Sequence, residues 1–317
     1  MNAGFARRGV GAKQPPACLL PMTISFEGRV AIVTGAGGGL GRAYALELAR
    51  RGARVMVNDL GGARDGLGAS DAASRVVAEI EGDGGEAIAN GANVSDFEQV
   101  QAMVAAARER WGSVHILINN AGILRDKSFA KMDMADFRAV IDVHLIGSAN
   151  CARAVWDGMR QAGYGRILMT SSSSGLFGNF GQANYGAAKL GLLGLGRTLS
   201  IEGAKHDIRV NTIAPTAATR MTEDLLPPEM IGAFSPESVV PAALFLVSQD
   251  APTNAIVGAG AGVVQAAYVT LTPRAVLAEN TAEAIAASWS QITDRSGEIV
   301  PQTGAEQAMS ILKALQA

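Results

Sequence analysis

Short apolar segments alternate with longer amphipathic segments along most of the chain after residue 28. The apolar segments are rich in Val, Ile and Leu and contain few polar residues, which is typical of strands buried on both faces. Strands are predicted over residues 30–34, 54–58, 87–93, 115–119, 166–170 and 209–213, with a weaker candidate at 255–264.

The intervening segments have the period and the length of helices, with a Gly or Asp at the junctions. Helices are predicted over residues 41–51, 70–81, 97–111, 136–162, 183–205 and 236–248. Strands that alternate with helices predict βαβ units, and near-continuous apolar strands need helices on both faces of the sheet. The predicted fold class is α/β, a doubly wound parallel sheet in three α/β/α layers that forms a single domain.

The two ends of the chain depart from this pattern. Residues 1–22 are basic, acid-free and proline-rich, and we expect a disordered leader before Met22, with a targeting peptide as the alternative. Residues 269–317 contain two helical segments, 281–289 and 306–316. They predict a C-terminal helical extension that covers a neighbouring subunit or closes over a substrate pocket. The α/β domain is then expected over residues 23–268.

Composition and charge exclude several classes of protein. The chain has 317 residues, of which 48% are hydrophobic and 18% charged, as in a globular protein rather than a disordered one. Lys and Arg number 27 and Asp and Glu 29, so a net charge of −2 argues against nucleic acid or a membrane surface as partner. No apolar run is long enough to span a bilayer. Cys18 and Cys151 form neither a disulfide framework nor a metal site, so we expect a metal-free, cytoplasmic protein.

A glycine-rich turn joins the first predicted strand to the first predicted helix. It reads T-G-A-G-G-G-L-G over residues 34–41 and includes Gly35, Gly39, Leu40 and Gly41. Without Cβ atoms the backbone turns tightly and points its N–H groups and the helix N-terminus at a pyrophosphate. The strand before the turn and the helix after it favour a dinucleotide site over a flexible loop.

Asp59 follows the second predicted strand. A carboxylate at this point accepts hydrogen bonds from both hydroxyls of an adenine ribose and repels a 2′-phosphate, which favours NAD over NADP. Two alternatives stay open. Asp59 is a turn or capping residue, or Arg42 or Arg64 pairs with a 2′-phosphate and NADP is preferred.

Ser172, Tyr185 and Lys189 are the candidate catalytic residues. Tyr185 and Lys189 are four residues apart in a predicted helix and therefore share one face. Ser172 follows the fifth predicted strand, at the sheet edge where ligands bind in open α/β folds. A neighbouring ammonium lowers the pKa of a tyrosine. Tyr185 is expected to take the proton of a substrate alcohol while hydride passes to a nicotinamide, and Ser172 to hold the substrate oxygen.

These residues resemble the motifs of the short-chain dehydrogenase/reductase family. The matching motifs are T-G-x-x-x-G-x-G at residues 34–41, N-N-A-G at 119–122 and Y-x-x-x-K at 185–189. The resemblance extends from about residue 26 to 264 and implies a Rossmann-like sheet. It also implies that Ser172, Tyr185 and Lys189 are catalytic, and that Tyr185 and Lys189 contact the cofactor.

The resemblance implies further site residues. Cofactor contacts are expected from Asn93, Val94, Asn119, Ala121, Gly122, Pro215 and Thr219. His144 stands where many relatives have an asparagine whose backbone anchors a water of a proton relay. His144 either joins that relay as a catalytic residue or is a packed helix histidine.

Segments 58–62, 121–126, 178–185 and 214–222 resemble one branch of the family. That branch contains the 3-hydroxyacyl-CoA dehydrogenase part of peroxisomal multifunctional β-oxidation enzymes and its stand-alone bacterial relatives. It implies NAD-dependent oxidation of a 3-hydroxyacyl-CoA to a 3-ketoacyl-CoA, in fatty-acid or steroid side-chain β-oxidation, with 17β-hydroxysteroid activity alongside. An NADPH-dependent 3-oxoacyl reductase of fatty-acid or polyketide synthesis is the alternative. The three catalytic candidates disfavour a non-catalytic NAD-binding scaffold.

Helices 136–162 and 183–205 are rich in Ala, Gly and Leu. Relatives associate through these two helices, so the resemblance implies a homodimer or homotetramer. A buried face inside a monomer would have the same composition.

Overall fold

The structure, a computed structural model, describes residues 23–68, 70–218 and 232–315. Its strands are β1 (Val30–Thr34), β2 (Arg54–Asn58), β3 (Glu86–Asn90), β4 (Ile116–Asn119), β5 (Gly165–Thr170), β6 (Ile208–Pro215), β7 (Ile256–Gly260) and β8 (Val263–Ala267). They form one sheet in the order β3-β2-β1-β4-β5-β6-β7-β8. All neighbours are parallel except β7 and β8, which form an antiparallel hairpin.

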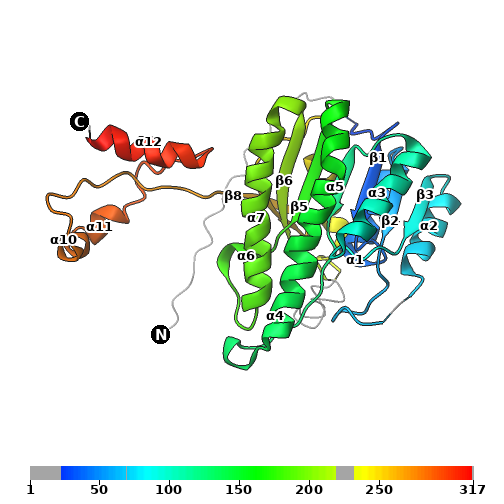
Figure 1. Cartoon of the computed structure of the whole chain (residues 1–317), viewed down its shortest axis with the longest axis horizontal. Helices are drawn as coiled ribbons and strands as arrows, with labels where there is room; N and C mark the ends of the chain where they lie inside the picture. The colour runs from blue at the N-terminus through cyan, green and yellow to red at the C-terminus, as the bar shows by residue number, and fades with distance from the viewer. Residues whose placement is uncertain (1–22, 69, 219–231, 316–317) are drawn as a thin grey trace, which may run out of the picture.

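Helices cover both faces of this sheet (Figure 1). The α-helices of the domain are α1 (Gly39–Arg50), α2 (Ala72–Gly82), α3 (Phe97–Trp111), α4 (Met134–Ile141), α5 (Gly147–Ala162), α6 (Ser173–Phe177), α7 (Ala183–Gly203) and α9 (Val240–Leu246). Shorter turns are η1 (Phe129–Lys131), η2 (Asp142–Ile146), η3 (Ala204–His206) and η5 (Pro236–Ser238).

Successive residues of β1 enter different cores. Val30 and Ile32 pack in the core beneath α3, α5 and α7, whereas Ala31 and Val33 pack in the core beneath α1, α2 and α9. All five β1 residues are buried because both faces are covered, as the continuous apolar segment predicts. The doubly wound, three-layer α/β/α class is confirmed.

β1 has β2 on one side and β4 on the other, so the order of strands along the sheet reverses between β1 and β4. In open α/β sheets, ligands bind outside the carboxyl ends of the strands at such a reversal. The glycine-rich turn after β1 and the segments after β2 and β4 all begin at this edge.

Several predicted elements differ in their bounds. The third strand ends at Asn90 rather than at residue 93, because the Asn90 side chain accepts a hydrogen bond from the Ala92 N–H (2.9 Å) and turns the chain. The weak strand predicted at 255–264 is the hairpin of β7 and β8. Ala261 and Gly262 both have positive φ values (50° and 76°), as the two central residues of a type I′ turn require.

The long helix predicted over residues 136–162 is divided in three. It begins two residues earlier, as α4, where the Asp133 carboxylate caps the Ala135 N–H (2.8 Å). The π-helical turn η2 then separates α4 from α5. The short helix α6 was not predicted, and Ser172 caps it by accepting a hydrogen bond from Ser174 N (3.2 Å).

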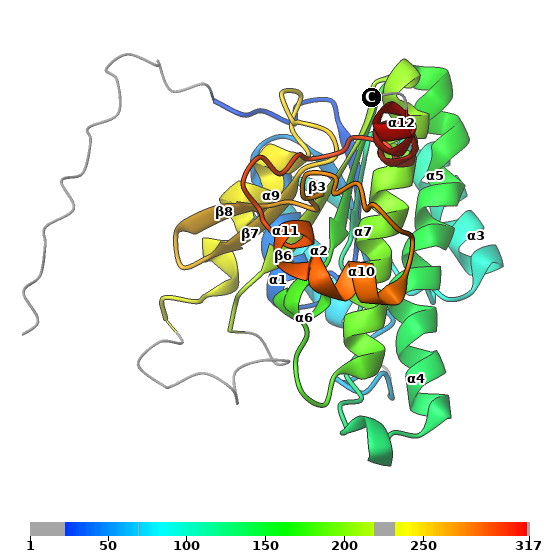
Figure 2. The ribbon, with the colours of Figure 1, turned by 90° about the vertical axis from the view of Figure 1, so that its left-hand side faces the viewer.

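After β8 the chain forms the C-terminal extension, which contains α10 (Ala282–Ala287), α11 (Trp289–Ile292) and α12 (Gly304–Leu315). The extension projects beyond α7 at one side of the sheet (Figures 1 and 2). The Arg197 guanidinium on α7 donates a hydrogen bond to the Pro301 carbonyl (2.7 Å). Neither α10 nor α11 has a buried residue. That residues 269–317 form a unit separate from residues 23–268 stays a prediction.

Among the residues that the structure describes, no helix combines the length and apolar character needed to cross a membrane.

Candidate active site

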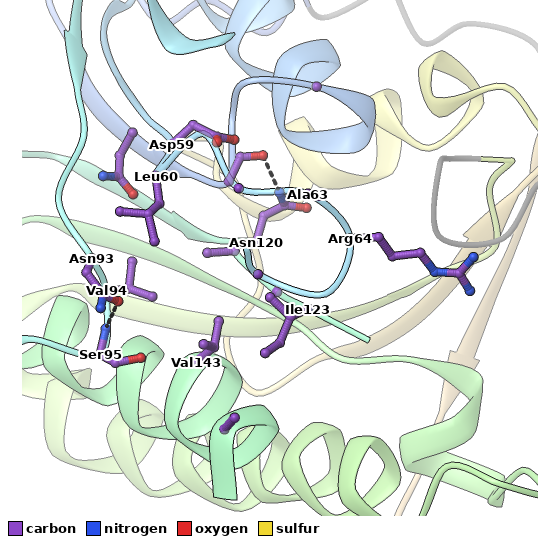
Figure 3. A pocket seen from close by; sticks show the side chains of 18 of the residues that line it. Asp59, Leu60, Ala63, Arg64, Asn93, Val94, Ser95, Asn120, Ile123 and Val143 are labelled. Atoms are coloured by element: carbon purple, nitrogen blue, oxygen red, sulfur yellow. Dashed lines mark hydrogen bonds between the residues drawn. The ribbon is translucent and has the colours of Figure 1, made fainter. Parts of the chain in front are cut away.

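A cleft of about 430 Å³ lies at the carboxyl edge of the sheet, where the strand order reverses. Residues of the glycine-rich turn, of the segments after β2, β3 and β4, and of η2 line it (Figure 3). The predicted cofactor residues that line it are Gly35, Gly39, Leu40, Asp59, Asn93, Val94, Ala121 and Gly122.

The glycine-rich turn fits a pyrophosphate. A Cβ atom at Gly35, whose φ is +63°, would lie 2.7 Å from Ala121 Cα, and one at Gly41 would lie 2.2 Å from the Gly35 carbonyl oxygen. Gly41 therefore serves close packing rather than lining the cleft. Helix α1 begins at Gly39 with no side-chain cap and no acidic residue in its first turn. Gly39 and Leu40 line the cleft, so the N-terminus of α1 lies at its edge.

Asn120 fastens this turn to the segment after β4. Its side-chain amide donates hydrogen bonds to the carbonyls of Thr34 (3.0 Å) and Gly35 (3.1 Å), and its backbone N–H donates to Thr34 Oγ1 (3.0 Å). The neighbouring Asn119 is buried, and its amide points at the sulfur of Met169 (3.4 Å). Of this pair, Asn120 and not the predicted Asn119 lines the cleft.

Asp59 is held at the end of β2 by two backbone donors. Gly37 N–H donates to Oδ2 (2.8 Å) and Gly61 N–H donates to Oδ1 (2.7 Å). Each oxygen keeps a further lone pair, so the carboxylate still has acceptor capacity toward the cleft that it lines. Asp59 thus combines a turn role with a position suited to a ribose.

Apolar side chains bound the same half of the cleft. Leu60 lies on one side, and Val94 and Val143 lie on the other, with Ile123 nearby (Figure 3). The Asn93 side chain accepts a hydrogen bond from the Ser95 N–H (3.0 Å), which fixes the turn after β3. This arrangement suits a flat apolar ring such as adenine.

Ser172, Tyr185 and Lys189 meet beside the cleft. Tyr185 and Lys189 share one face of α7, and Lys189 Nζ lies 5.4 Å from the centre of the Tyr185 ring. Lys189 is 3% exposed and donates a hydrogen bond to the Thr170 carbonyl at the end of β5 (2.6 Å). The Ser172 side chain is hydrogen-bonded to Tyr185. The structure thus places these three predicted side chains near one another, and their catalytic role stays a prediction.

Their pKa values shift in the directions that burial dictates. Burial raises the pKa of Tyr185 to about 12, against the opposing hydrogen bond with Ser172. Burial lowers the pKa of Lys189 to about 7. The sequence argument expects Lys189 to lower the pKa of Tyr185. The pKa of Tyr185 is raised instead, because burial disfavours the charged form of each of the two side chains.

His144 lies in the π-helical turn and is 2% exposed. Its Nε2 atom lies 2.8 Å from the Ile123 carbonyl oxygen and 3.1 Å from the Ile123 nitrogen. The ring packs edge-on against Tyr185, with ring centres 5.2 Å apart at 90°. Burial lowers the pKa of His144 well below its usual value, so the ring is neutral. Its Nδ1 atom has no hydrogen-bond partner in the described part of the chain.

His144 also explains the glycine of the N-N-A-G motif. A Cβ atom at Gly122 would lie 2.2 Å from His144 Cε1, so any larger residue would displace the ring. His144 therefore connects the Gly122–Ile123 wall of the cleft to the ring of Tyr185.

Five of the predicted cofactor residues do not line the cleft, namely Gly41, Asn119, Tyr185, Lys189 and Pro215. Pro215 ends β6 at the same edge of the sheet but does not line the cavity. Thr219 lies outside the described residues.

Sequence reasoning missed several cleft residues: Gly38, Asn58, Leu60, Gly62, Ala63, Gly66, Ala92, Ser95, Asn120, Ile123, Ala139, Asp142 and Val143. Residues 60–66 follow Asp59 directly, and their three glycines mark them as a turn-rich segment at the ligand-binding edge. A glycine-rich segment directly after a strand, at the ligand-binding edge, is the sequence signal that could have identified residues 60–66.

Comparisons with known proteins identify the family of the chain. The short chain dehydrogenase family profile matches residues 29–229. The chain therefore belongs to the short-chain dehydrogenase family, a class of oxidoreductases, and the resemblance of its motifs is confirmed.

Two curated relatives place it nearer to one branch. It is 46% identical to peroxisomal multifunctional enzyme A of Dictyostelium discoideum, over 93% of this chain and 66% of that protein. It is 49% identical to a short-chain type dehydrogenase/reductase of Mycobacterium tuberculosis, over 86% of this chain and 96% of that protein. The chain thus spans less than two thirds of the multifunctional enzyme and nearly all of the mycobacterial protein.

Solved structures give the same result. Full-length peroxisomal multifunctional enzyme type 2 of Drosophila melanogaster superposes with a TM-score of 0.79 at 37% identity, covering 92% of this chain and 50% of that one. A 7α-hydroxysteroid dehydrogenase complexed with NADH and 7-oxo glycochenodeoxycholic acid superposes with a TM-score of 0.68 at 31% identity, covering 76% and 96%.

Replacement of His144 should destabilise the protein. His144→Ala opens a cavity and leaves the Ile123 carbonyl without a donor, so the free energy of unfolding should fall by about 3 kcal/mol. His144→Asn restores a donor toward Ile123 and should recover about 1 kcal/mol. Urea denaturation measures both, with His206→Ala at the half-exposed end of η3 as the control. A His144→Ala protein as stable as the wild type would contradict this role.

Proposed function

We propose that this chain oxidises a secondary alcohol to a ketone with NAD, and that its substrate is a 3-hydroxyacyl-CoA. The observation that carries the proposal is the convergence of Ser172, Tyr185 and Lys189 beside a cleft that ends at Asp59. A hydroxyl-binding group thus stands next to a cavity whose other end suits an adenosine.

The residues of the cleft fit NAD. The backbone around Gly35 and Gly41 leaves no room for side chains, and the start of α1 offers free N–H groups to a pyrophosphate. Asp59 would hold the adenine ribose and Leu60, Val94 and Val143 the adenine. The related 7α-hydroxysteroid dehydrogenase was solved with NADH, which supports a nicotinamide dinucleotide here.

Arg42 and Arg64 are the two arginines that could pair with the 2′-phosphate of NADP. Arg42 forms an ion pair with Glu79 on α2. The Arg64 side chain extends away from Asp59 (Figure 3). With the Asp59 carboxylate at this end of the cleft, a 2′-phosphate would meet a negative charge, which supports NAD.

The chemistry follows from the positions of three side chains. Bound NAD supplies the acceptor for the hydride that leaves the substrate carbon. Tyr185 takes the hydroxyl proton through its phenol oxygen, and Ser172 donates a hydrogen bond to the substrate oxygen. Lys189, fixed by the Thr170 carbonyl, lies close enough to favour the phenolate when it is protonated. The positive charge of an oxidised nicotinamide ring bound beside Tyr185 would favour the phenolate as well.

In this proposal His144 positions Tyr185 rather than carrying protons. Its ring is neutral and one nitrogen is bonded to the Ile123 backbone, so it holds the Tyr185 ring against the wall of the cleft. The relay expected from the family resemblance would use other groups.

The substrate class rests on the relatives. The Dictyostelium and Drosophila enzymes carry the name multifunctional enzyme, and this chain corresponds to a part of each. We infer that this part, which carries Ser172, Tyr185 and Lys189, oxidises a 3-hydroxyacyl-CoA, as the branch resembled by segments 58–62, 121–126, 178–185 and 214–222 implies. The steroid-binding relative supports a hydroxysteroid as a second substrate, because both present a secondary alcohol on a large apolar body.

An NADPH-dependent 3-oxoacyl reductase shares the catalytic residues, and the position of Asp59 disfavours it. The homodimer or homotetramer and the cytoplasmic location expected from the sequence stay predictions. The peroxisomal names of the relatives describe those proteins.

Tyr185→Phe should remove the proton acceptor and keep the ring that packs on His144. Turnover should fall by about a thousandfold, while NADH affinity stays within about twofold. Tyr44→Phe is the matched control, because Tyr44 is fully buried in α1 and its hydroxyl has no partner in the described structure. Steady-state kinetics and NADH titration measure both variants. Normal turnover by Tyr185→Phe would refute the proposed base.

Asp59→Asn should weaken discrimination against NADP by about tenfold, because the carboxylate charge is lost while one acceptor oxygen is kept. Asp142→Asn is the control, since Asp142 lines the same cleft from η2 and tests general electrostatics. The ratio of kcat/KM values for NAD and NADP is the measurement. Equal ratios in the wild type and Asp59→Asn would assign cofactor choice to other residues.

A further inference from the structure

Residues 60–68, between Asp59 and α2, form a flap over the cleft. Five of its residues line the cavity, namely Leu60, Gly62, Ala63, Arg64 and Gly66. Its internal turn is closed by hydrogen bonds from the Ala63 N–H to the Leu67 carbonyl (2.7 Å) and from the Gly66 N–H to the Ala63 carbonyl (2.9 Å). The flap is therefore a folded loop with its own shape.

The flap is not held down by apolar burial. None of residues 62–68 is buried, and Leu60 and Leu67 are 49% and 63% exposed. A segment with so few buried apolar contacts opens at low free-energy cost unless specific bonds restrain it.

Contacts with the segment after β4 hold the flap. The Leu124 N–H donates to the Arg64 carbonyl (3.0 Å), and the Arg125 guanidinium donates through Nε to the Asp65 carbonyl (3.2 Å). Gly66 packs against Ile123, since a Cβ atom there would lie 3.0 Å from the Ile123 side chain. The hydrogen bond from Arg125 has a charged donor, and such bonds are stronger as a class than the neutral backbone bond from Leu124.

The other side of Arg125 is anchored in the catalytic half of the site. Its NH1 group pairs with Asp136 on α4 (3.0 Å), which aims the guanidinium, and the ion pair is mostly shielded from solvent. Its carbonyl accepts a hydrogen bond from the fully buried Asn184 (3.0 Å), whose side-chain oxygen in turn accepts from the Tyr185 N–H (2.7 Å). Arg125 thus spans from the flap to the start of α7.

We propose that Arg125 is a positioning residue that latches the flap over the dinucleotide and limits how fast the dinucleotide leaves. The proposal rests on the proposed function, in that it takes the cleft to bind NAD and NADH. Binding fills the space beneath the flap, and release requires the flap to separate from the Ile123–Arg125 segment. The hydrogen bond from the Arg125 side chain to the Asp65 carbonyl can be removed by a substitution that leaves the backbone unaltered.

The test compares Arg125→Ala with Lys127→Ala. Lys127 is two residues away and pairs with the same Asp136 (3.3 Å), but its side chain makes no bond to the flap. Hydrogen exchange of the amides of residues 60–68 in the free protein measures the latch without a cofactor. Stopped-flow fluorescence of NADH measures its dissociation rate, and Arg125→Lys tests whether charge without the guanidinium fork is sufficient.

Arg125→Ala and Arg125→Lys should each speed flap exchange and NADH release by about tenfold, whereas Lys127→Ala should stay within about twofold of wild type. Wild-type exchange and release rates in Arg125→Ala would overturn the latch while leaving the proposed function intact. Failure of the wild-type protein to bind NADH would overturn the proposed function and the retention role together. Asp136→Asn, which frees the guanidinium without removing it, should give a smaller acceleration than Arg125→Ala.

Discussion

The hydrogen bonds between Thr34 and Asn120 hold together the two halves of this site. Thr34 ends β1, and Asn120 follows β4, the strand on the other side of the reversal in strand order. The Thr34 hydroxyl accepts from the backbone N–H groups of Asn120 (3.0 Å) and Ala121 (3.1 Å), while the Asn120 amide holds the Thr34 and Gly35 carbonyls. Because a parallel sheet brings these ends to one edge, the phosphate turn and the wall beside Tyr185 become one rigid surface.

From that surface the site extends in two directions. Toward β2 it continues to Asp59 and the flap of residues 60–68, which define the adenosine half. Toward α7 it continues through Ile123 and His144 to Tyr185, where proton transfer is proposed. The two halves differ in how far their residues are buried. Burial removes water around Tyr185 and Lys189 and shifts both pKa values, whereas the flap stays exposed and depends on single polar contacts.

The sequence was sufficient to predict elements whose local pattern agrees with their tertiary environment. β1 and β2 have the predicted bounds because they are apolar on both faces, and Tyr185 and Lys189 meet because helical spacing alone brings them together. It was insufficient where the conformation depends on contacts distant in sequence. The π-helical turn carries His144, whose Nε2 atom lies within hydrogen-bond distance of the Ile123 backbone, and the β7–β8 hairpin turns at Ala261, a residue without turn preference. Asn119, the predicted cofactor contact, is buried at the end of β4, and the next residue, Asn120, lines the cleft instead.

The most direct test of the account is the absorbance of reduced nicotinamide after purified protein is mixed with NAD and 3-hydroxyacyl-CoAs of several chain lengths. The account predicts rapid NADH formation with at least one acyl-CoA, and much slower reaction when NADP replaces NAD. No reduction of NAD by any acyl-CoA, together with NADPH-driven reduction of a 3-ketoacyl substrate, would contradict it. That result would mean that Asp59 does not select the cofactor and that the chain works as a biosynthetic reductase.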